Sequence, residues 1–221
     1  MNSAGASPSL WDRVYERVRR ELGDAPGCHD FAHTLRVLKN AVRIASEESC
    51  CDPDAVRFGA LLHDVARPEE LASGGKLCHA ALGADKARRI LEEEGCEDAA
   101  FIRHISEIVR THRYRGNLKP ATLEACIVYD ADKLDSLGAF GVARAFHFAG
   151  RIGACLHNSE QEALASESYS SQDSAYREYL VKLRGLPDHL LTDSARRLAA
   201  DRAAFMRAFF DRLNEEQEGR R

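Results

Sequence analysis

The apolar residues of this chain recur at the spacing of an α-helix. Near the N-terminus, Trp11, Val14, Tyr15, Val18 and Leu22 follow the i, i+3, i+4, i+7 rule, which places them on one face of a helix. No segment shows the convincing alternation of a β-strand, and no internal repeat of fixed period is present. The pattern predicts an all-α protein with helices over residues 11–22, 30–48, 52–66, 78–94, 98–112, 122–149, 175–184 and 192–214.

Capping residues, glycine and proline mark the expected ends of these helices. Asp52, followed by proline, is a good helix start, and Pro68 is expected to end the same helix. Gly138 and Gly141 lie inside the longest pattern, where we expect a bend because glycine in a helix costs about 1 kcal/mol relative to alanine. The Ser-rich segment 150–174 is irregular and is predicted to be an exposed loop or a lid. Further breaks are expected at 23–27, 73–75 and 113–120.

Length and composition indicate one globular domain. The chain has 221 residues, of which 44% are hydrophobic and 30% are charged, with a formal net charge of −4. We expect a disordered lead over 1–9, a single domain with a C-terminal helical extension over 10–215, and a tail over 216–221. Neither nucleic acid nor a membrane is expected as a partner. The bulk charge does not favour the former, and no apolar run approaches the roughly 18 residues that a membrane span needs.

The cysteines and the N-terminal residues indicate the cellular compartment of the protein. The chain contains 7 cysteines, an odd number, and no CxxC pair, so a zinc ribbon is not expected. The first nine residues lack the basic start and the apolar core of a signal peptide. These features together predict a reduced, cytoplasmic protein, and Cys126 is expected in its core.

The dipeptide His63-Asp64 is the strongest sign of chemistry. It ends an apolar, helix-forming run, where few structural needs place two good metal ligands. The segment from Cys28 to His33, which opens the second helix, and the segment from Tyr129 to Asp135 in the long helix offer further histidines and aspartates as partners. Imidazole nitrogen and carboxylate oxygen suit a divalent transition metal such as Mn, Fe, Co, Ni or Zn, with Mg as an alternative. Two histidines and two aspartates with open coordination positions fit a catalytic rather than a structural metal site.

The order His33, then His63-Asp64, then Asp132 resembles the HD-domain superfamily of metal-dependent phosphohydrolases. The segments around the first histidine and the last aspartate are similar to small bacterial HD hydrolases that include nucleotide pyrophosphohydrolases, and the likeness covers nearly the whole chain. The resemblance implies an HD-domain helical bundle with additional C-terminal helices. It also implies that these four residues bind the metal.

A second set of histidines resembles the two-metal members of the superfamily. His79 and Gly83 are similar to their His-x-x-x-Gly element, and His112 is similar to their later histidine. In those relatives the extra histidines hold a second metal, and the aspartate of the His-Asp pair bridges both. The small bacterial branch is generally treated as one-metal. We therefore predict one metal, and leave His79 and His112 as ligands of a second cation or as substrate-binding residues.

A phosphate substrate also needs positive charge and a path for protons. Arg36 lies one helical turn beyond the first ligand histidine and is the preferred cation, with Arg67 and Lys133 as further candidates. The metal would polarise a phosphoryl oxygen and activate water for attack on phosphorus. Arg36 would stabilise the added negative charge, while His112 and Asp64 are candidates for moving the proton.

Several residues beside the ligands have open roles. Asp30 could orient the ring of the first ligand histidine, or it could merely cap the helix together with His29. Asp135 is expected to orient a ligand or a neighbouring lysine. Some HD phosphohydrolases use a glutamate shortly after the His-Asp pair, but the spacing of Glu69 and Glu70 does not support that role here.

The predicted substrate is a small-molecule phosphate, with a nucleotide favoured. The resemblance implies cleavage of a nucleoside triphosphate to monophosphate and pyrophosphate, and the ligand set would equally serve a nucleoside monophosphatase or a cyclic-nucleotide phosphodiesterase. A di-iron HD-type oxygenase and a non-catalytic nucleotide-binding sensor stay open as alternatives. A homodimer through the last helix is also open, although core packing is favoured for its aromatic residues Phe205, Phe209 and Phe210.

Overall fold

The structure is a computed structural model that describes residues 7–23, 28–113 and 118–221. These residues form eleven α-helices and one 3-10 helix, and no strand is found among them. The all-α prediction is therefore confirmed. Part of the predicted lead (1–6) and parts of two predicted breaks (24–27 and 114–117) lie outside the described residues.

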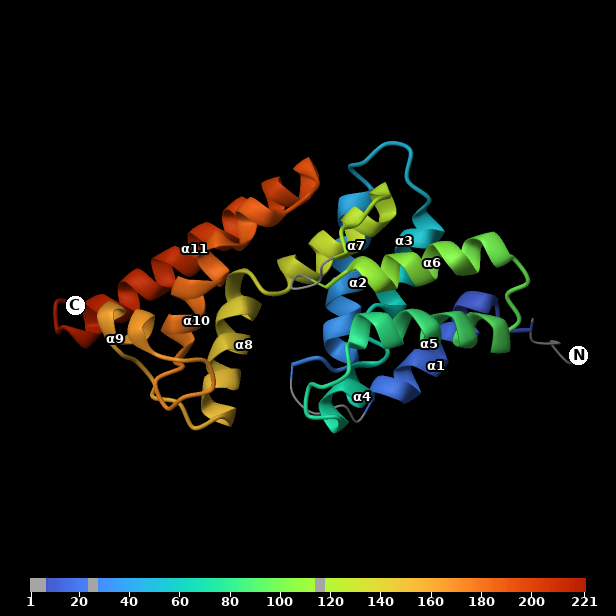
Figure 1. Ribbon diagram of the computed structural model, residues 1–221. Coiled ribbons are helices and arrows are strands. Elements are labelled where there is room, and N and C mark those ends of the chain that lie inside the picture. The colour runs from blue at the N-terminus through green and yellow to red at the C-terminus, as the bar shows by residue number, and fades with distance from the viewer. Residues whose placement is uncertain (1–6, 24–27, 114–117) are drawn as a thin grey trace, which may run out of the picture. The chain divides into compact units, whose positions relative to one another are not determined.

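The chain forms two compact units that divide between Tyr129 and Asp130, within helix α7 (Figure 1). The helices up to that point are α1 (Leu10–Leu22), α2 (Phe31–Ala45), α3 (Pro53–Leu62), α4 (Arg67–Ala72), α5 (His79–Glu93), α6 (Ala99–Thr111) and the first part of α7 (Leu123–Leu134). The second unit contains α8 (Gly138–Arg151), α9 (Glu160–Ala165), α10 (Ala175–Val181), the 3-10 helix η1 (Leu183–His189) and α11 (Asp193–Gln217).

Helix α1 confirms the helical spacing of its apolar residues. Val14, Val18 and Leu22 are fully buried, as the period of the pattern requires. Ser9 and Asp12 form a capping box, in which each side chain accepts a hydrogen bond from the other residue's backbone N–H. The local sequence thus specifies where α1 begins, and burial of one face holds it in the unit.

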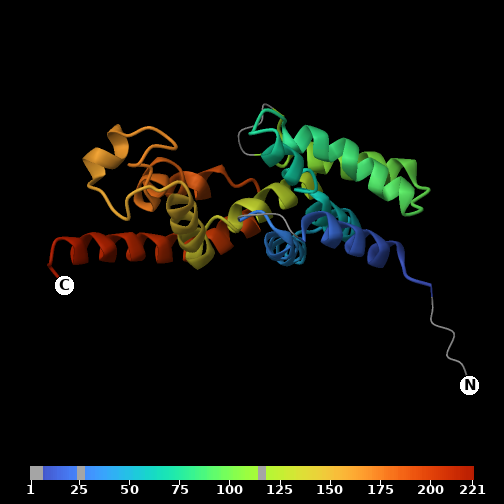
Figure 2. The ribbon, with the colours of Figure 1, turned by 90° about the horizontal axis from the view of Figure 1, so that it is seen from below.

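Two helix pairs bring the candidate site together. Helix α2 packs on α3, and α5 runs beside α6 in both Figure 1 and Figure 2. Gly59 of α3 lies against Ile108 of α6, where an added Cβ would come 2.6 Å from Ile108 Cγ2. Glycine therefore lets these two helices approach closely. His63 and His112 stand at the C-terminal caps of α3 and α6, so the same contact sets their separation.

The third helix ends earlier than predicted. Asp52 caps α3 as expected, but α3 ends at Leu62, and residues 63–66 form turns. Pro68 does not end α3 and instead lies in the first turn of α4, where its missing N–H costs no hydrogen bond. The prediction of helix through residue 66 was wrong because the apolar spacing continues across the turn.

The predicted long helix over 122–149 is two helices. Helix α7 ends at Leu134, and α8 begins at Gly138, whose φ of +71° lies in the left-handed region. Glycine adopts this conformation without a steric cost, so the chain breaks here rather than bends. At Gly141 an added Cβ would come 2.3 Å from the Ser136 carbonyl oxygen, so this glycine permits the tight connection.

The second unit is organised by α11, which packs against α8 and η1. Phe210 is fully buried and stacks on Tyr179 with 4.4 Å between the ring centroids. Phe209 is half-buried, whereas the side chain of Phe205 is 48% exposed. Core packing is therefore confirmed for Phe210 and does not extend to Phe205.

The segment 150–174 is more ordered than its composition suggests. It contains the short helix α9, which begins with a capping box between Ser159 and Glu162. Its flanks are tied together by a hydrogen bond from Ser174 Oγ to Asn158 Oδ1 at 2.6 Å, and both side chains are buried. The expectation of a wholly irregular loop was wrong, and a lid stays a prediction.

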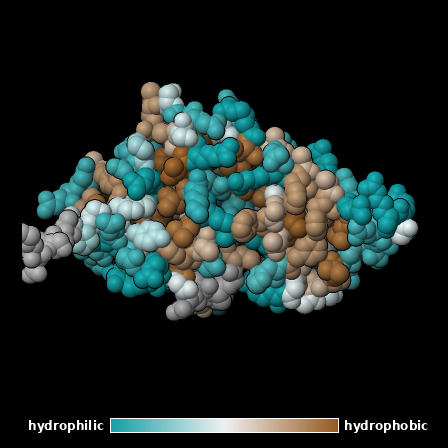
Figure 3. Space-filling model, turned by 180° about the vertical axis from the view of Figure 1, so that it is seen from behind, coloured by the Kyte–Doolittle hydropathy of each residue, from teal (hydrophilic) through white to brown (hydrophobic). Residues whose placement is uncertain are grey.

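The remaining features of the fold are its surface, its cysteines and the length of its apolar helices. Figure 3 shows hydrophilic side chains over much of one face, interrupted by apolar areas. None of the 7 cysteines, which all lie in the described residues, forms a disulfide. Cys126 is half-buried, so the prediction of a core position was wrong. In the described part of the chain, no helix combines the length and the apolar character needed to cross a membrane.

Candidate metal centre

His63 and Asp64 project from the turn that follows α3. Both are buried, with exposed fractions of 0% and 1%. Backbone hydrogen bonds from Val65 N to Leu62 O (3.2 Å) and from Arg67 N to Asp64 O (2.9 Å) hold the turn. The apolar run before the dipeptide is therefore a core helix that delivers two polar side chains to the interior.

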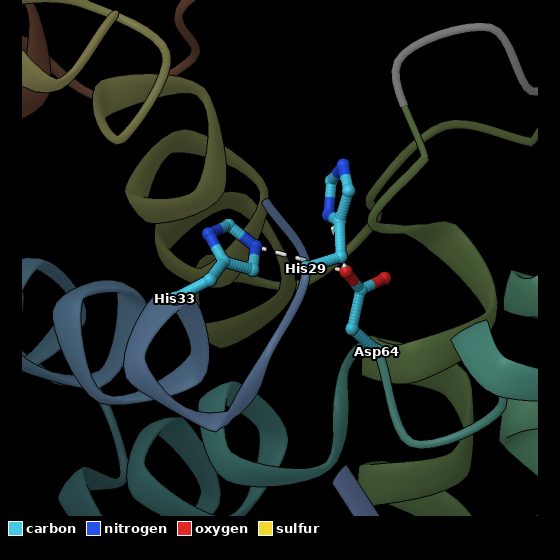
Figure 4. A group of neighbouring side chains, drawn as sticks. All are labelled: His29, His33 and Asp64. Atoms are coloured by element: carbon cyan, nitrogen blue, oxygen red, sulfur yellow. Dashed lines mark hydrogen bonds and ion pairs between the residues drawn. The ribbon is translucent and has the colours of Figure 1, made fainter. Parts of the chain in front are cut away.

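Two histidines at the start of α2 reach Asp64. His33 lies in the first turn, where Asp30 Oδ1 accepts a hydrogen bond from His33 N at 2.8 Å. His33 Nε2 lies 3.6 Å from Asp64 Oδ2, and His29 Nδ1 lies 2.9 Å from the same oxygen. Figure 4 shows both rings beside the Asp64 carboxylate. Asp30 is thus the N-cap of α2, whereas His29 belongs to the site rather than to the cap.

The Asp64 carboxylate stands between two pairs of imidazoles. The Nε2 atoms of His33 and His63 are 3.3 Å apart and lie 3.6 and 3.7 Å from Asp64 Oδ2. The Nε2 atoms of His79 and His112 are 3.2 Å apart and lie 3.4 and 3.5 Å from Asp64 Oδ1. The packing of α5 on α6 brings this second pair together.

The outer ring nitrogens of three histidines face hydrogen-bond acceptors. Nδ1 of His63 and Nδ1 of His112 each lie against the backbone carbonyl three residues earlier, at 2.8 and 2.6 Å. Nδ1 of His79 lies 2.9 Å from the Glu70 carboxylate. For His63 and His112 an oxygen acceptor at this position requires the proton on Nδ1, which leaves a lone pair on Nε2. Nδ1 of His79 also lies 3.1 Å from Arg67 Nη1, but that group donates to the same Glu70 oxygen, so the shared acceptor places the proton on Nδ1 here as well. Partners of this kind orient histidines that bind metals.

These atoms fit a divalent cation. Asp64 Oδ1 is buried and accepts no hydrogen bond from the described residues, although the Nε2 atoms of His79 and His112 are beside it. With the protons on Nδ1, the lone pairs of two imidazoles and a carboxylate converge and repel one another unless a cation or a proton lies between them. Among the described residues of this unit, two groups have ligand atoms within 4.8 Å of one another: His29, His33 and Asp64, and Asp64, His79 and His112.

Arg67 and Glu70 line the site beside Asp64. Arg67 Nε lies 3.3 Å from Asp64 Oδ2, and its Nη1 donates a hydrogen bond to Glu70, which is only 7% exposed. Spacing in the sequence did not support a role for Glu70. The available signal was proline at the second residue of a new helix, because a helix that begins at Arg67 places residues 67 and 70 on one face.

Burial and neighbouring charges set the protonation of the site. Burial lowers the pKa of His79 to about 4 despite the opposing charge of Asp64, and burial likewise lowers the pKa of His29. Burial alone would raise the pKa of Asp64, but the neighbouring Arg67 guanidinium, together with the donors around the carboxylate, outweighs this effect and holds that pKa well below its usual range. Neutral imidazoles and an ionised carboxylate are the forms that bind metals.

Other predicted residues lie as follows. Arg36 is half-buried on α2, one turn beyond His33. Asp132 belongs to the second unit, where its Oδ2 accepts a hydrogen bond from Lys133 Nζ at 3.1 Å. Asp135, in the same unit, pairs with Arg144 at 2.7 Å. The roles of these residues toward a metal or a substrate stay predictions.

A buried cluster of histidines around one aspartate, in an all-α unit, defines a helical domain of the metal-binding type. The HD domain family matches residues 30–137 of this chain. The uncharacterized protein YpgQ from Bacillus subtilis is 35% identical over 214 residues, which cover 94% of each chain. The chain therefore belongs to the HD domain family.

Solved structures agree with this assignment. A predicted HD superfamily hydrolase from an uncultured Thermotogales bacterium is 31% identical, with a TM-score of 0.65 over 92% of this chain and 91% of that one. Bacillus subtilis YpgQ in complex with ADP is 29% identical, with a TM-score of 0.70 over 94% of each chain. The similarity to both structures extends through the two units.

Proposed function

We propose that this protein is a metal-dependent phosphohydrolase that acts on a nucleotide or on a related phosphate ester or anhydride. The observation that carries this proposal is the Asp64 carboxylate, with a pair of imidazole Nε2 atoms beside each oxygen. Membership of the HD domain family supports the hydrolase class. The complex of Bacillus subtilis YpgQ with ADP supports a nucleotide, and cleavage of a triphosphate to monophosphate and pyrophosphate is the finer proposal.

The ligand assignment follows the order of the residues and their chemistry. We assign one cation to His33, His63, Asp64 and Asp132. The imidazole pair beside Asp64 Oδ1 would hold a second cation or the substrate phosphate. The nitrogen and oxygen donors suit Mn, Fe, Co, Ni or Zn, with Mg as an alternative.

The residues around these ligands would bind the phosphate and transfer the proton. A bound divalent cation polarises a phosphoryl oxygen and lowers the pKa of a bound water. The Arg67 guanidinium, beside Asp64, would turn toward the phosphate, and Arg36 would add positive charge from α2. When only one cation is bound, His112 Nε2 is the atom that would hold the proton taken from water, with Asp64 as the alternative.

Replacing His63 and Asp64 together by alanine tests the assignment. We expect the double variant to lose bound metal, measured by mass spectrometry, and to lose hydrolysis across a panel of nucleotides with Mn²⁺, Co²⁺, Ni²⁺ or Mg²⁺. The matched control is His147→Ala, because His147 is exposed on α8 and should leave both properties unchanged. If metal content and hydrolysis both survive in the double variant, the site assignment is wrong. Tight nucleotide binding by the wild type without turnover would instead support a sensor.

A di-iron oxygenase is the second candidate, and the imidazole pair of His79 and His112 favours it. That pair completes a histidine set on both oxygens of one carboxylate. The oxygenase reading predicts two irons per chain and oxygen uptake on a small organic substrate. Oxygen-electrode measurements on iron-loaded protein, beside the nucleotide panel, separate the two functions.

A further inference from the structure

Glu70 contacts both a candidate metal ligand and the cation beside it. Its Oε2 lies 2.9 Å from His79 Nδ1 and also accepts a hydrogen bond from Arg67 Nη1. Its Oε1 lies 3.6 Å from Arg113 Nη2. Helix α4 packs on α5 (Figure 1), so tertiary packing creates the contact between Glu70 and His79.

The neighbouring glutamate has different partners. Glu69 Oε1 lies 2.6 Å from Lys86 Nζ, and its side chain is 38% exposed, against 9% for the Glu70 side chain. Two adjacent residues with the same chemistry therefore have different partners: Glu69 pairs with Lys86, whereas Glu70 contacts His79 and Arg67. The chain thus offers a matched control for any effect of Glu70.

We infer that Glu70 is a positioning residue that prepares His79 for divalent-cation binding at the cluster of Asp64, His79 and His112. This inference rests on the metal site of the proposed function. The Glu70 carboxylate accepts the Nδ1 proton of His79, which directs the Nε2 lone pair at Asp64 Oδ1, 3.4 Å away. Without this acceptor the ring could take the other tautomer, which puts a proton where a cation must bind.

Glu70 also offsets the charge of Arg67. Arg67 Nε lies 3.3 Å from Asp64 Oδ2, so the guanidinium repels any cation that Asp64 binds. The Glu70 carboxylate pairs with this guanidinium in a buried setting, where charges interact more strongly than in water. Loss of Glu70 would leave Arg67 to compete with the cation for Asp64. The charge effect and the orientation effect therefore act in the same direction.

The contacts of Glu70 differ from those of a general base. Its Oε2 already faces two donors, and its Oε1 faces Arg113. A carboxylate engaged in this way stabilises its neighbours and is poorly placed to take a proton from water. Its influence on the reaction would therefore act through His79 and Arg67.

Titration with Co²⁺ tests this inference. Co²⁺ affinity, followed by visible absorbance and by analysis of bound metal, is compared between the wild type and the variants Glu70→Ala, Glu70→Gln, Glu69→Ala and His79→Ala. We expect Glu70→Ala to weaken Co²⁺ binding by about 10–100-fold, the usual effect of removing a residue that orients a metal ligand, and to approach His79→Ala. Glu69→Ala should match the wild type. Glu70→Gln keeps an oxygen acceptor but not the charge, so its loss should be smaller.

Folding and activity are followed separately. Circular dichroism and thermal unfolding show whether each variant is folded. If Glu70→Ala does not fold, Glu70→Gln is compared with Glu69→Ala instead. Equal Co²⁺ affinity in the folded Glu70 variants and in Glu69→Ala overturns the inference. A wild type that binds Co²⁺ as expected but hydrolyses no nucleotide overturns the proposed function and leaves the role of Glu70 in metal binding intact.

Discussion

Asp64 organises the candidate site through the different surroundings of its two oxygens. Oδ2 faces His29, His33 and His63, while Oδ1 faces the other imidazole pair and lacks a hydrogen bond from the described residues. The sequence indicated the dipeptide, because paired ligand types stand out in an apolar run, and the resemblance to two-metal HD proteins indicated His79 and His112. It could not indicate Glu70, because the value of that residue depends on a ring that arrives from another helix.

At the residue scale, acidification should lower the free energy of unfolding of the metal-free protein. Burial holds the pKa of His79 at about 4 in the folded state, against 6.5 for the ordinary side chain. The unfolded chain therefore binds a proton between these values while the folded chain does not. This contribution to stability is complete above pH 6.5 and is lost as the pH falls toward 4, by about 1.4 kcal/mol per pH unit for one group.

Urea unfolding of chelator-treated protein across this pH range measures the effect. His79→Gln should reduce the slope of the unfolding free energy against pH, because glutamine does not titrate. A slope that stays the same in this variant would contradict the assignment of the effect to His79.

At the scale of elements, the caps and first turns of the helices carry the candidate ligands. His63 and His112 lie at C-terminal caps, and His33 and His79 lie in first turns. Apolar spacing predicted these helices well but missed the break after Leu62, because the apolar spacing does not change there. Helix ends depend on local backbone conformation and packing, which the hydrophobic pattern does not encode.

Substitution of Gly59 by alanine should disturb the site from a distance. The added Cβ would come 2.6 Å from Ile108 Cγ2, so α3 and α6 would have to separate. We expect destabilisation of about 1–3 kcal/mol in urea unfolding, the usual cost of overpacking a core, and weaker metal binding in the same variant. Gly150→Ala in α8 is the control, because nothing lies within 4 Å of its Cβ position. That change should be neutral or stabilising, and equal destabilisation by both would contradict the role of close packing.

At the scale of the molecule, the imidazole clusters around Asp64 lie in the unit that precedes Asp130. The second unit has its own anchors, since the Asp130 carboxylate accepts hydrogen bonds from the backbone N–H groups of Leu191 and Thr192 and from the Thr192 hydroxyl. A ligand that binds only the folded state raises the free energy of unfolding of the part of the chain that forms its site. Metal should therefore stabilise a fold in which α2, α3, α5 and α6 all supply or position ligands.

Calorimetry should show this coupling directly. Co²⁺ or Mn²⁺ at a hundred times its dissociation constant should add about 2.7 kcal/mol to the unfolding free energy. His33→Ala should remove most of this gain, whereas His147→Ala, at an exposed position of α8, should keep it. A gain of the same size in His33→Ala would place the bound metal elsewhere.

The sequence by itself determined the helical class, most helix positions and the His63-Asp64 dipeptide, because apolar period and ligand chemistry are local properties. The resemblance to HD proteins added His33, His79 and His112. Only the tertiary structure decided that His29 contacts Asp64, that Glu70 contacts His79 while Glu69 pairs with Lys86, and that the helix breaks at Gly138. These features arise from packing between helices and from backbone conformation at single residues. The His63-Asp64 dipeptide can be recognised in the sequence, but the histidines that surround the two oxygens of Asp64 come together only in the folded chain.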